Sequence, residues 1–73
     1  MTKIIASIPV YNVPADAQNF IVAGYTINFR YWASFADRAE AFAYMREYED
    51  ATPCSLAVFD IAGDSADVEE WAD

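Results

Sequence analysis

Residues 19–32, NFIVAGYTINFRYW, carry the strongest β-strand pattern in the chain and decide the predicted fold. The odd positions from Tyr25 hold tyrosine, isoleucine, phenylalanine and tyrosine, and the even positions hold threonine, asparagine, arginine and tryptophan. This alternation is typical of a strand with one buried face. Gly24 lies inside the run and predicts a bulge or bend there. We therefore expect one long strand.

Two further strands are expected on either side of this stretch. Residues 3–11, KIIASIPVY, alternate as a strand does, and Pro9 limits backbone pairing near the end of that strand. Residues 12–18 are rich in turn-forming residues and predict a loop. Residues 54–61, CSLAVFDI, predict a third strand, but the pattern leaves open which of its faces is buried.

A helix is predicted between the second and third strands, from about Phe35 to about Glu49. Ser34 is expected to cap its first turn, where the carboxylate of Asp37 also meets the positive end of the helix dipole. At 100° per residue the apolar side chains share one arc, with Arg38 inside it, its stem expected to snorkel toward the sheet edge. The opposed arc holds these residues: Asp37, Glu40, Tyr44 and Glu47.

These elements predict a single small domain, residues 1–73, of the α+β class. The order β-β-α-β gives a three-stranded antiparallel or mixed sheet, with the first strand in the middle and antiparallel to both neighbours. The helix covers one face of this sheet. The other face is expected to show these residues: Ile5, Thr26, Asn28, Arg30 and Trp32.

The last ten residues, DSADVEEWAD, combine five carboxylates with one tryptophan. Ser65 or Asp64 can cap a short helix over residues 66–72, so we expect a short C-terminal helix or a docked tail. Trp71 would then pin this segment onto the open sheet face near Trp32. The tail carboxylates would point outward, and those of interest are Asp64, Asp67, Glu69 and Glu70.

The charge balance bears on the class of partner. Twelve acidic and four basic residues, with no histidine, give a formal net charge of −8. Binding to nucleic acid or to an anionic membrane needs clustered basic residues, so neither is expected. A strongly negative field instead favours encounter with a basic surface on another protein. Solubility alone is the alternative explanation of this charge.

Few residues of this chain suit catalysis or cofactor binding. The absence of histidine removes the commonest general base, and Lys3 is the only lysine. The only glycines are Gly24 and Gly63, so there is no glycine-rich phosphate loop. Cys54 is the only cysteine, which excludes a cysteine-based zinc site. We predict that the protein is not an enzyme and binds no metal and no cofactor.

The lone cysteine and the apolar pattern also predict a location. One cysteine allows no intrachain disulfide, which fits a reducing cytosol. The apolar run in residues 1–13 is too short for a signal peptide, and no stretch approaches the roughly 20 apolar residues of a membrane span. A cytoplasmic protein is expected.

The acidic arc of the predicted helix is the candidate binding surface. Asp37, Glu40 and Glu47 have no basic residue three or four positions away. Residues three or four apart on a helix rise about 4.5–6 Å, against about 3.4 Å per phosphate in a nucleic-acid strand. Such an edge can coarsely imitate a line of phosphates, and an ordinary solvated helix face is the alternative. Tyr44 would anchor the interface, or simply lie over neighbouring alanines.

The opening KIIASIPVYN, followed after the predicted helix by LAVFDIAGD, resembles the first domain of the ArdA antirestriction proteins, which are acidic DNA mimics from mobile elements. Gly24-Tyr25-Thr26 stands where that family has a glycine, an aromatic residue and an acid. In size and charge the chain also resembles small acidic phage inhibitors, including many anti-CRISPR proteins. The matching positions are Ile5, Ala6, Ser7, Tyr11, Asn12, Ala57, Asp60 and Gly63.

Charge and resemblance together predict an inhibitor of a host nuclease defence. The expected partner is a basic nucleic-acid-binding surface on a CRISPR-Cas or restriction effector, contacted by the acidic helix arc and the acidic tail. An ArdA-like antirestriction protein is one alternative. A structural or oligomeric interaction module, which uses the open sheet face around Ile5, Arg30 and Trp32, is another. The sequence allows a monomer or a homodimer.

Overall fold

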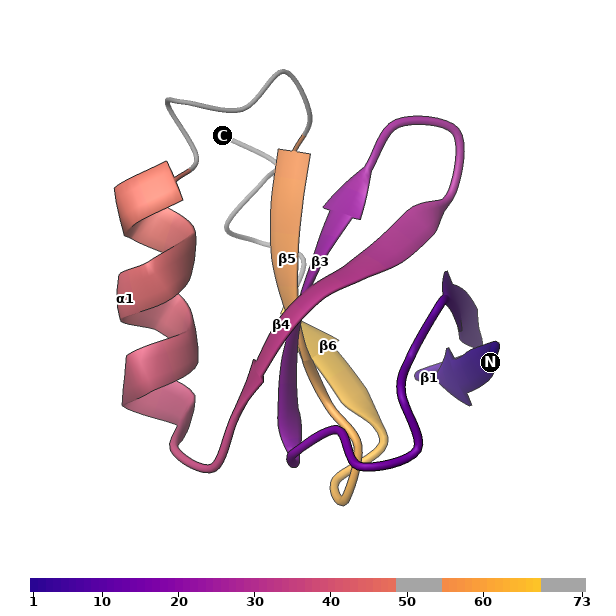
Figure 1. Cartoon of the computed structure of the whole chain (residues 1–73), viewed down its shortest axis with the longest axis horizontal. Coiled ribbons are helices and arrows are strands. Elements are labelled where there is room, and N and C mark those ends of the chain that lie inside the picture. Colours follow the sequence, from indigo (N-terminus) through magenta and orange to yellow (C-terminus); the bar gives the residue numbers. More distant parts are fainter. Residues whose placement is uncertain (49–54, 68–73) are drawn as a thin grey trace.

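A computed structural model of the protein describes residues 1–48 and 55–67 (Figure 1). Within these ranges the chain forms one helix and six strands, and all six strands belong to one sheet in the order β1-β2-β4-β3-β5-β6. Only β2 and β4 pair in parallel. The elements are β1 (Lys3–Ile5), β2 (Ile8–Tyr11), β3 (Phe20–Tyr25), β4 (Phe29–Phe35), α1 (Arg38–Tyr48), β5 (Ser55–Asp60) and β6 (Ser65–Asp67).

The sheet curls into a nearly closed barrel whose two edge strands approach each other. A hydrogen bond spans the gap: the backbone N–H of Ala6, in the β1–β2 turn, donates to Oδ1 of Asp64, in the β5–β6 turn, at 2.8 Å. These two turns belong to opposite ends of the strand order. The Asp64 carboxylate therefore links the two edges of the sheet, which backbone hydrogen bonds between two edge strands would join in a complete barrel.

The interior of the barrel forms the first of two hydrophobic cores. The rings of Phe29 and Phe59 meet edge to face there, with their centroids 5.0 Å apart. Burying an aromatic pair of this kind contributes more than the area alone, by about 0.5–1.5 kcal/mol. The buried members of this core are Ile5, Val10, Val13, Ile21, Ala23, Phe29, Ala57 and Phe59.

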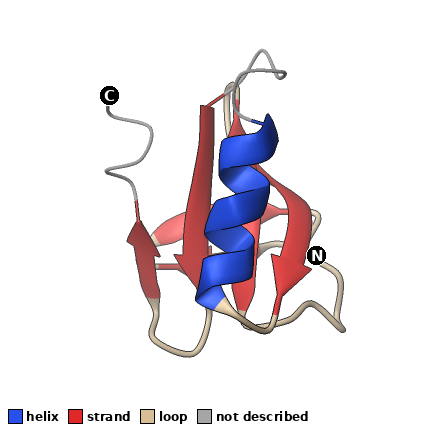
Figure 2. Cartoon of the chain, turned by 90° about the vertical axis from the view of Figure 1, so that its left-hand side faces the viewer, coloured by secondary structure: helices blue, strands red, loops and turns tan. Residues whose placement is uncertain are grey.

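The second core lies between α1 and the outer side of β3 and β5 (Figure 2). Ala41 and Met45 of the helix are fully buried against Val22, Leu56 and Val58. Residues of β3 and β5 alternate between this core and the barrel interior, so both strands are buried on both faces. This explains why the sequence pattern of residues 54–61 pointed to neither face: the strand is present, and both of its faces are inside.

The prediction of a three-stranded sheet was wrong, because two of its strands each contain a turn. Residues 3–11 fold back at Ala6 and Ser7 into the β1–β2 hairpin. Residues 19–32 fold back at 26–28 into the β3–β4 hairpin, where the N–H of Thr26 donates to the carbonyl of Asn28 at 3.4 Å. The centre of the sheet is therefore occupied by β3 and β4, and the predicted central strand lies at one edge.

The bulge in this region also lies elsewhere than predicted. Val22 pairs with Ala33 and Ala23 pairs with Tyr31, so Trp32 is the extra residue on β4. Gly24 pairs regularly with strands on both sides. The bulge turns the Trp32 side chain to the outer surface, where 37% of it is exposed.

The helix and the C-terminal segment differ from their predicted bounds. Helix α1 begins at Arg38 rather than near Phe35, which instead ends β4. The predicted helix over 66–72 is wrong at its start, because Ser65–Asp67 pairs with β5 as β6. The remaining part of that prediction lies outside the described residues, and so do the expected roles of Glu69, Glu70 and Trp71.

Asn19 holds the β5–β6 turn in place through both its side chain and its backbone. Its Nδ2 donates to Oδ1 of Asp60 at 3.0 Å, and its Oδ1 accepts the N–H of Ala62 at 2.9 Å. The Asn19 carbonyl accepts the N–H of Ile61 at 2.9 Å. Oδ1 of Asp60 also accepts the N–H of Gly63 at 3.0 Å, and a Cβ at position 63 would lie 2.7 Å from the same carboxylate. The turn that carries Asp64 is therefore held by the residue that precedes β3.

Asn19→Ala is expected to lower the free energy of unfolding by about 1–2 kcal/mol, because it removes two side-chain hydrogen bonds and leaves part-buried Asp60 with one partner fewer. Urea denaturation monitored by tryptophan fluorescence measures the change. Gln18→Ala is the matched control, since only the backbone of Gln18 bonds to Ser34. Equal stability of the two variants would contradict this role of Asn19.

The β1–β2 turn predicts a stabilising substitution. Ala6 and Ser7 have φ angles of 53° and 65°, which a two-residue hairpin turn requires and which Asn-Gly adopts far more readily. Ala6→Asn combined with Ser7→Gly is expected to raise the free energy of unfolding by about 1 kcal/mol. Thermal and urea unfolding measure it. A neutral or destabilising result for this pair would show that the turn carries no such strain.

Candidate functional site

Acidic residues are concentrated in the second half of the chain. Residues 1–36 contain one of the 12 acidic residues, Asp16, together with the bases Lys3 and Arg30. The other acidic residues lie between 37 and 73. In the described part of the chain this second half forms α1, β5, β6 and their turns, whereas the first half forms β1 to β4. Among the described residues, the carboxylates of this half therefore lie on or next to α1, at the end of β5, in the β5–β6 turn and on β6.

The acidic edge of α1, formed by Glu40 and Glu47, is the clearest charged feature. Both side chains are exposed, and they lie seven residues apart, which corresponds to about 10 Å along the helix axis. Asp37 precedes them as the N-cap: its Oδ1 accepts the N–H of Ala39 at 2.9 Å. Because Ala41 and Met45 are buried under the helix, this edge is held rigidly.

The cap was predicted at Ser34, but this residue belongs to β4. Its hydroxyl oxygen accepts the N–H of Gln18 at 2.9 Å and the hydroxyl of Tyr31 at 3.3 Å. Ser34 therefore ties the loop before β3 to β4, and Asp37 alone supplies the capping carboxylate.

Tyr44 lies between Glu40 and Glu47 and is half-buried rather than fully exposed. Its ring contacts those of Phe35 and Tyr48, with centroid distances of 5.3 Å and 4.6 Å. Burial raises the pKa of the Tyr44 phenol, and nearby Tyr48, Tyr31 and Glu47 raise it further. The phenol therefore stays neutral at physiological pH.

The opposite edge of α1 is basic. The guanidinium carbons of Arg38 and Arg46 lie 4.8 Å and 5.7 Å from the ring centroid of Phe42. Arg38 was expected to extend toward the sheet edge, but it lies over this ring instead. The helix thus presents its charges as two separate edges of opposite sign.

The predicted tail acids are not all placed alike. Asp64 has a φ of 50° and uses its carboxylate to bond Ala6 across the barrel gap. Asp67 ends β6. In Figure 1, α1 stands beside the strands and the β5–β6 turn lies below them. Asp64 thus belongs to a different element from Glu40 and Glu47.

The outer side of β1, β2 and β4 is the uncovered sheet surface. Ile5 was predicted to lie on it but is buried inside the barrel, with 2% of its surface exposed. Arg30 is exposed there, and so are parts of Trp32 and Tyr11. Ile4 is 63% exposed on β1. The uncovered face therefore includes Arg30 and Trp32 as predicted, but Ile5 does not belong to it.

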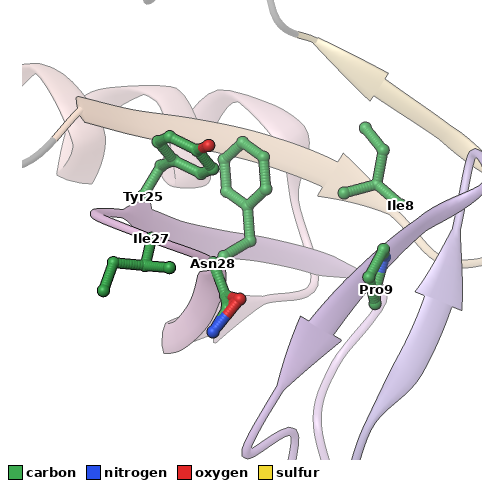
Figure 3. Close-up of a pocket in the computed structure, with 6 residues that line it drawn as sticks. Ile8, Pro9, Tyr25, Ile27 and Asn28 are labelled. Carbon is green, nitrogen blue, oxygen red and sulfur yellow. The ribbon is translucent and has the colours of Figure 1, made fainter.

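A small apolar pocket opens between β2 and the tip of the β3–β4 hairpin (Figure 3). Its volume is about 160 Å³. No feature of the sequence predicted it, because it depends on the turn at 26–28 that the alternating pattern concealed. The residues that line it are Ile8, Pro9, Tyr25, Ile27, Asn28 and Phe29.

Residues 1–48 and 55–67 contain neither a cluster of metal ligands nor a membrane-spanning helix. These ranges contain no group of three or more histidine, cysteine, aspartate or glutamate side chains that could hold a metal ion. Helix α1, the helix in these ranges, is neither long enough nor apolar enough to cross a membrane. Comparison of the chain with protein-family models, curated proteins and solved structures gives no match.

Substitutions of Asp37 separate its capping role from its charge. Asp37→Ala is expected to lower the free energy of unfolding by about 1 kcal/mol, because the N–H of Ala39 loses its acceptor. Asp37→Asn keeps a capping oxygen and should cost only a few tenths of a kcal/mol from the lost dipole interaction. Chemical denaturation measures both. Equal losses in the two variants would contradict a capping role.

Proposed function

We propose that the protein inhibits a host nuclease defence system, in the first place a CRISPR-Cas effector, by occupying a basic nucleic-acid-binding surface with the acidic edge of α1. The observation that carries this proposal is the exposure of Glu40 and Glu47 on one edge of a helix that is packed firmly onto the sheet. A basic groove that binds phosphates also attracts carboxylates presented in this way.

The geometry of the acidic edge suits such a groove. Glu40 and Glu47 are separated by about 10 Å along the helix axis, close to the rise along a nucleic-acid axis over three nucleotides of one strand, at about 3.4 Å each. Since the helix is already ordered by its packing, binding costs little backbone entropy. The edge can therefore meet a row of lysine or arginine side chains without rearrangement.

Other residues have supporting roles in this proposal. Tyr44 offers an aromatic ring and a neutral hydroxyl between the two glutamates. Asp37 fixes the start of the helix and adds a charge to its first turn. The further acids Asp64, Asp67, Glu69 and Glu70 extend the negative field that steers encounter. The protein would act in the cytoplasm, where the effector lies, by binding and without chemistry of its own.

A restriction effector is the alternative target, because it also holds DNA in a basic groove. The resemblance to the ArdA proteins supports this alternative, and the carboxylates would act in the same way. The two targets are separated by the identity of the nuclease complex that the tagged protein retains from a host lysate.

The double variant Glu40→Gln/Glu47→Gln is expected to bind the retained complex about tenfold more weakly, since each exposed ion pair contributes up to about 1 kcal/mol. Its thermal unfolding should stay unchanged, because both side chains are exposed. Surface plasmon resonance measures the affinity. Asp16→Asn is the matched control, which removes one exposed carboxylate from the first half of the chain.

Salt provides the decisive condition for this experiment. Electrostatic binding weakens as ionic strength rises, since the Debye length falls from about 30 Å at 0.01 M to about 8 Å at 0.15 M. An affinity that does not fall over this range, or a double variant that binds as tightly as the unsubstituted protein, would sink the proposal.

A further inference from the structure

The tip of the β3–β4 hairpin carries the most exposed large apolar side chain of the described residues. Ile27 is 84% exposed and is one of the residues that line the apolar pocket. Figure 3 shows its side chain directed away from Ile8 and Pro9, which border the pocket on β2. A protruding aliphatic group and a hollow of matching chemistry therefore lie next to each other on one surface, which we call the hairpin face.

The size of the pocket fits one side chain. A cavity of about 150 Å³ accepts a benzene molecule, and the pocket measures about 160 Å³. Its walls are almost entirely carbon, from Ile8, Pro9, Tyr25 and Phe29. A branched aliphatic side chain such as that of isoleucine would fill most of this space and remove both apolar surfaces from water.

The hairpin face is also free of carboxylates along the sequence that builds it. Residues 1–36 contain only Asp16, which lies in the loop between β2 and β3. The two basic residues of this half, Lys3 and Arg30, belong to β1 and β4. Among the described residues, the carboxylates other than Asp16 belong to α1 and its N-cap, β5, the β5–β6 turn and β6, so the strands that build the hairpin face bring few like charges toward a second copy.

We propose that two copies of this chain associate through the hairpin face, with Ile27 of each copy entering the pocket of the other. A two-fold contact requires that one patch be complementary to itself, and a knob beside a hole satisfies this requirement. Figure 1 shows the hairpin tip and α1 on different sides of the molecule, so the acidic edge of α1 stays exposed in such a dimer. The inference is independent of the proposed function.

The dimer has the opposite salt dependence from binding to a basic partner. The apolar contact is insensitive to salt, whereas repulsion between two copies of like charge is screened by it. Association therefore strengthens as ionic strength rises. One side chain per pocket is a small contact, so we expect a dissociation constant on the order of 10–100 μM at 0.15 M salt.

Sedimentation equilibrium from about 5 to 500 μM tests the proposal, with Cys54→Ser as the common background to prevent disulfide formation. The background protein should dimerise, and Ile27→Asp should weaken the dimer at least tenfold while leaving thermal unfolding unchanged. Ala43→Asp adds the same charge at an exposed position of α1 and should leave the dimer intact.

Cross-linking tests the pairing itself. The variants Ile27→Cys and Pro9→Cys, each made in the Cys54→Ser background, are mixed and oxidised, with a mass tag on one of them. Covalent pairs of unlike copies should exceed pairs of like copies, because Ile27 faces the partner's pocket. A monomer throughout the concentration range, a dimer unaffected by Ile27→Asp, or association that weakens with salt would each overturn the proposal.

Discussion

The structure depends on the burial of β3 and β5 on both faces. A chain of 73 residues buries only about 60% of its unfolded surface, so its apolar residues must be used in a dense arrangement. Here the inner side of this strand pair lines the barrel through residues such as Ile21 and Phe59, and the outer side carries α1 through Val22 and Val58. Two cores thus share one pair of strands. The hairpins, the helix and the closing turn are all arranged around that pair.

This arrangement also divides the surface. Helix α1 covers the outer side of the sheet near β3 and β5, and its charged side chains are exposed on that side of the molecule. The outer side of β1, β2 and the first part of β4 has no such cover, and Ile4, Tyr11 and Trp32 remain partly exposed there. The charged side and the apolar side are therefore both consequences of where one helix packs, and they offer two kinds of contact to other molecules.

The sequence predicted a helix and a strand over 54–61, because each rests on a strong local pattern, and the structure has α1 and β5 in these places. It concealed the two hairpin turns because each contains only one common turn residue, Ser7 in the first and Asn28 in the second. Ala6 and Ser7 adopt positive φ without glycine or asparagine, and the turn at 26–28 has only Asn28 as a signal. The segment from Ser65 to Asp67 shows a different cause. Its local pattern favoured a helix, but Asn19 and Asp60 hold the preceding turn so that the chain pairs with β5. The sequence did not predict the pocket either, because the pocket forms only when the chain turns at residues 26–28.

The acidic edge of α1 and the hairpin face act independently of each other only when salt screens the charges of α1. The molecule measures 28 × 26 × 19 Å, and the Debye length is about 8 Å at 0.15 M salt. Under these conditions the carboxylates of α1 exert little force on a group that approaches the hairpin face. At about 0.01 M the Debye length of about 30 Å exceeds every dimension of the molecule, so a second copy senses the whole charge of −8 wherever it approaches. The carboxylates that we propose to attract a basic partner would then also repel a second copy, and this coupling follows from the uneven distribution of charge between the two halves of the chain.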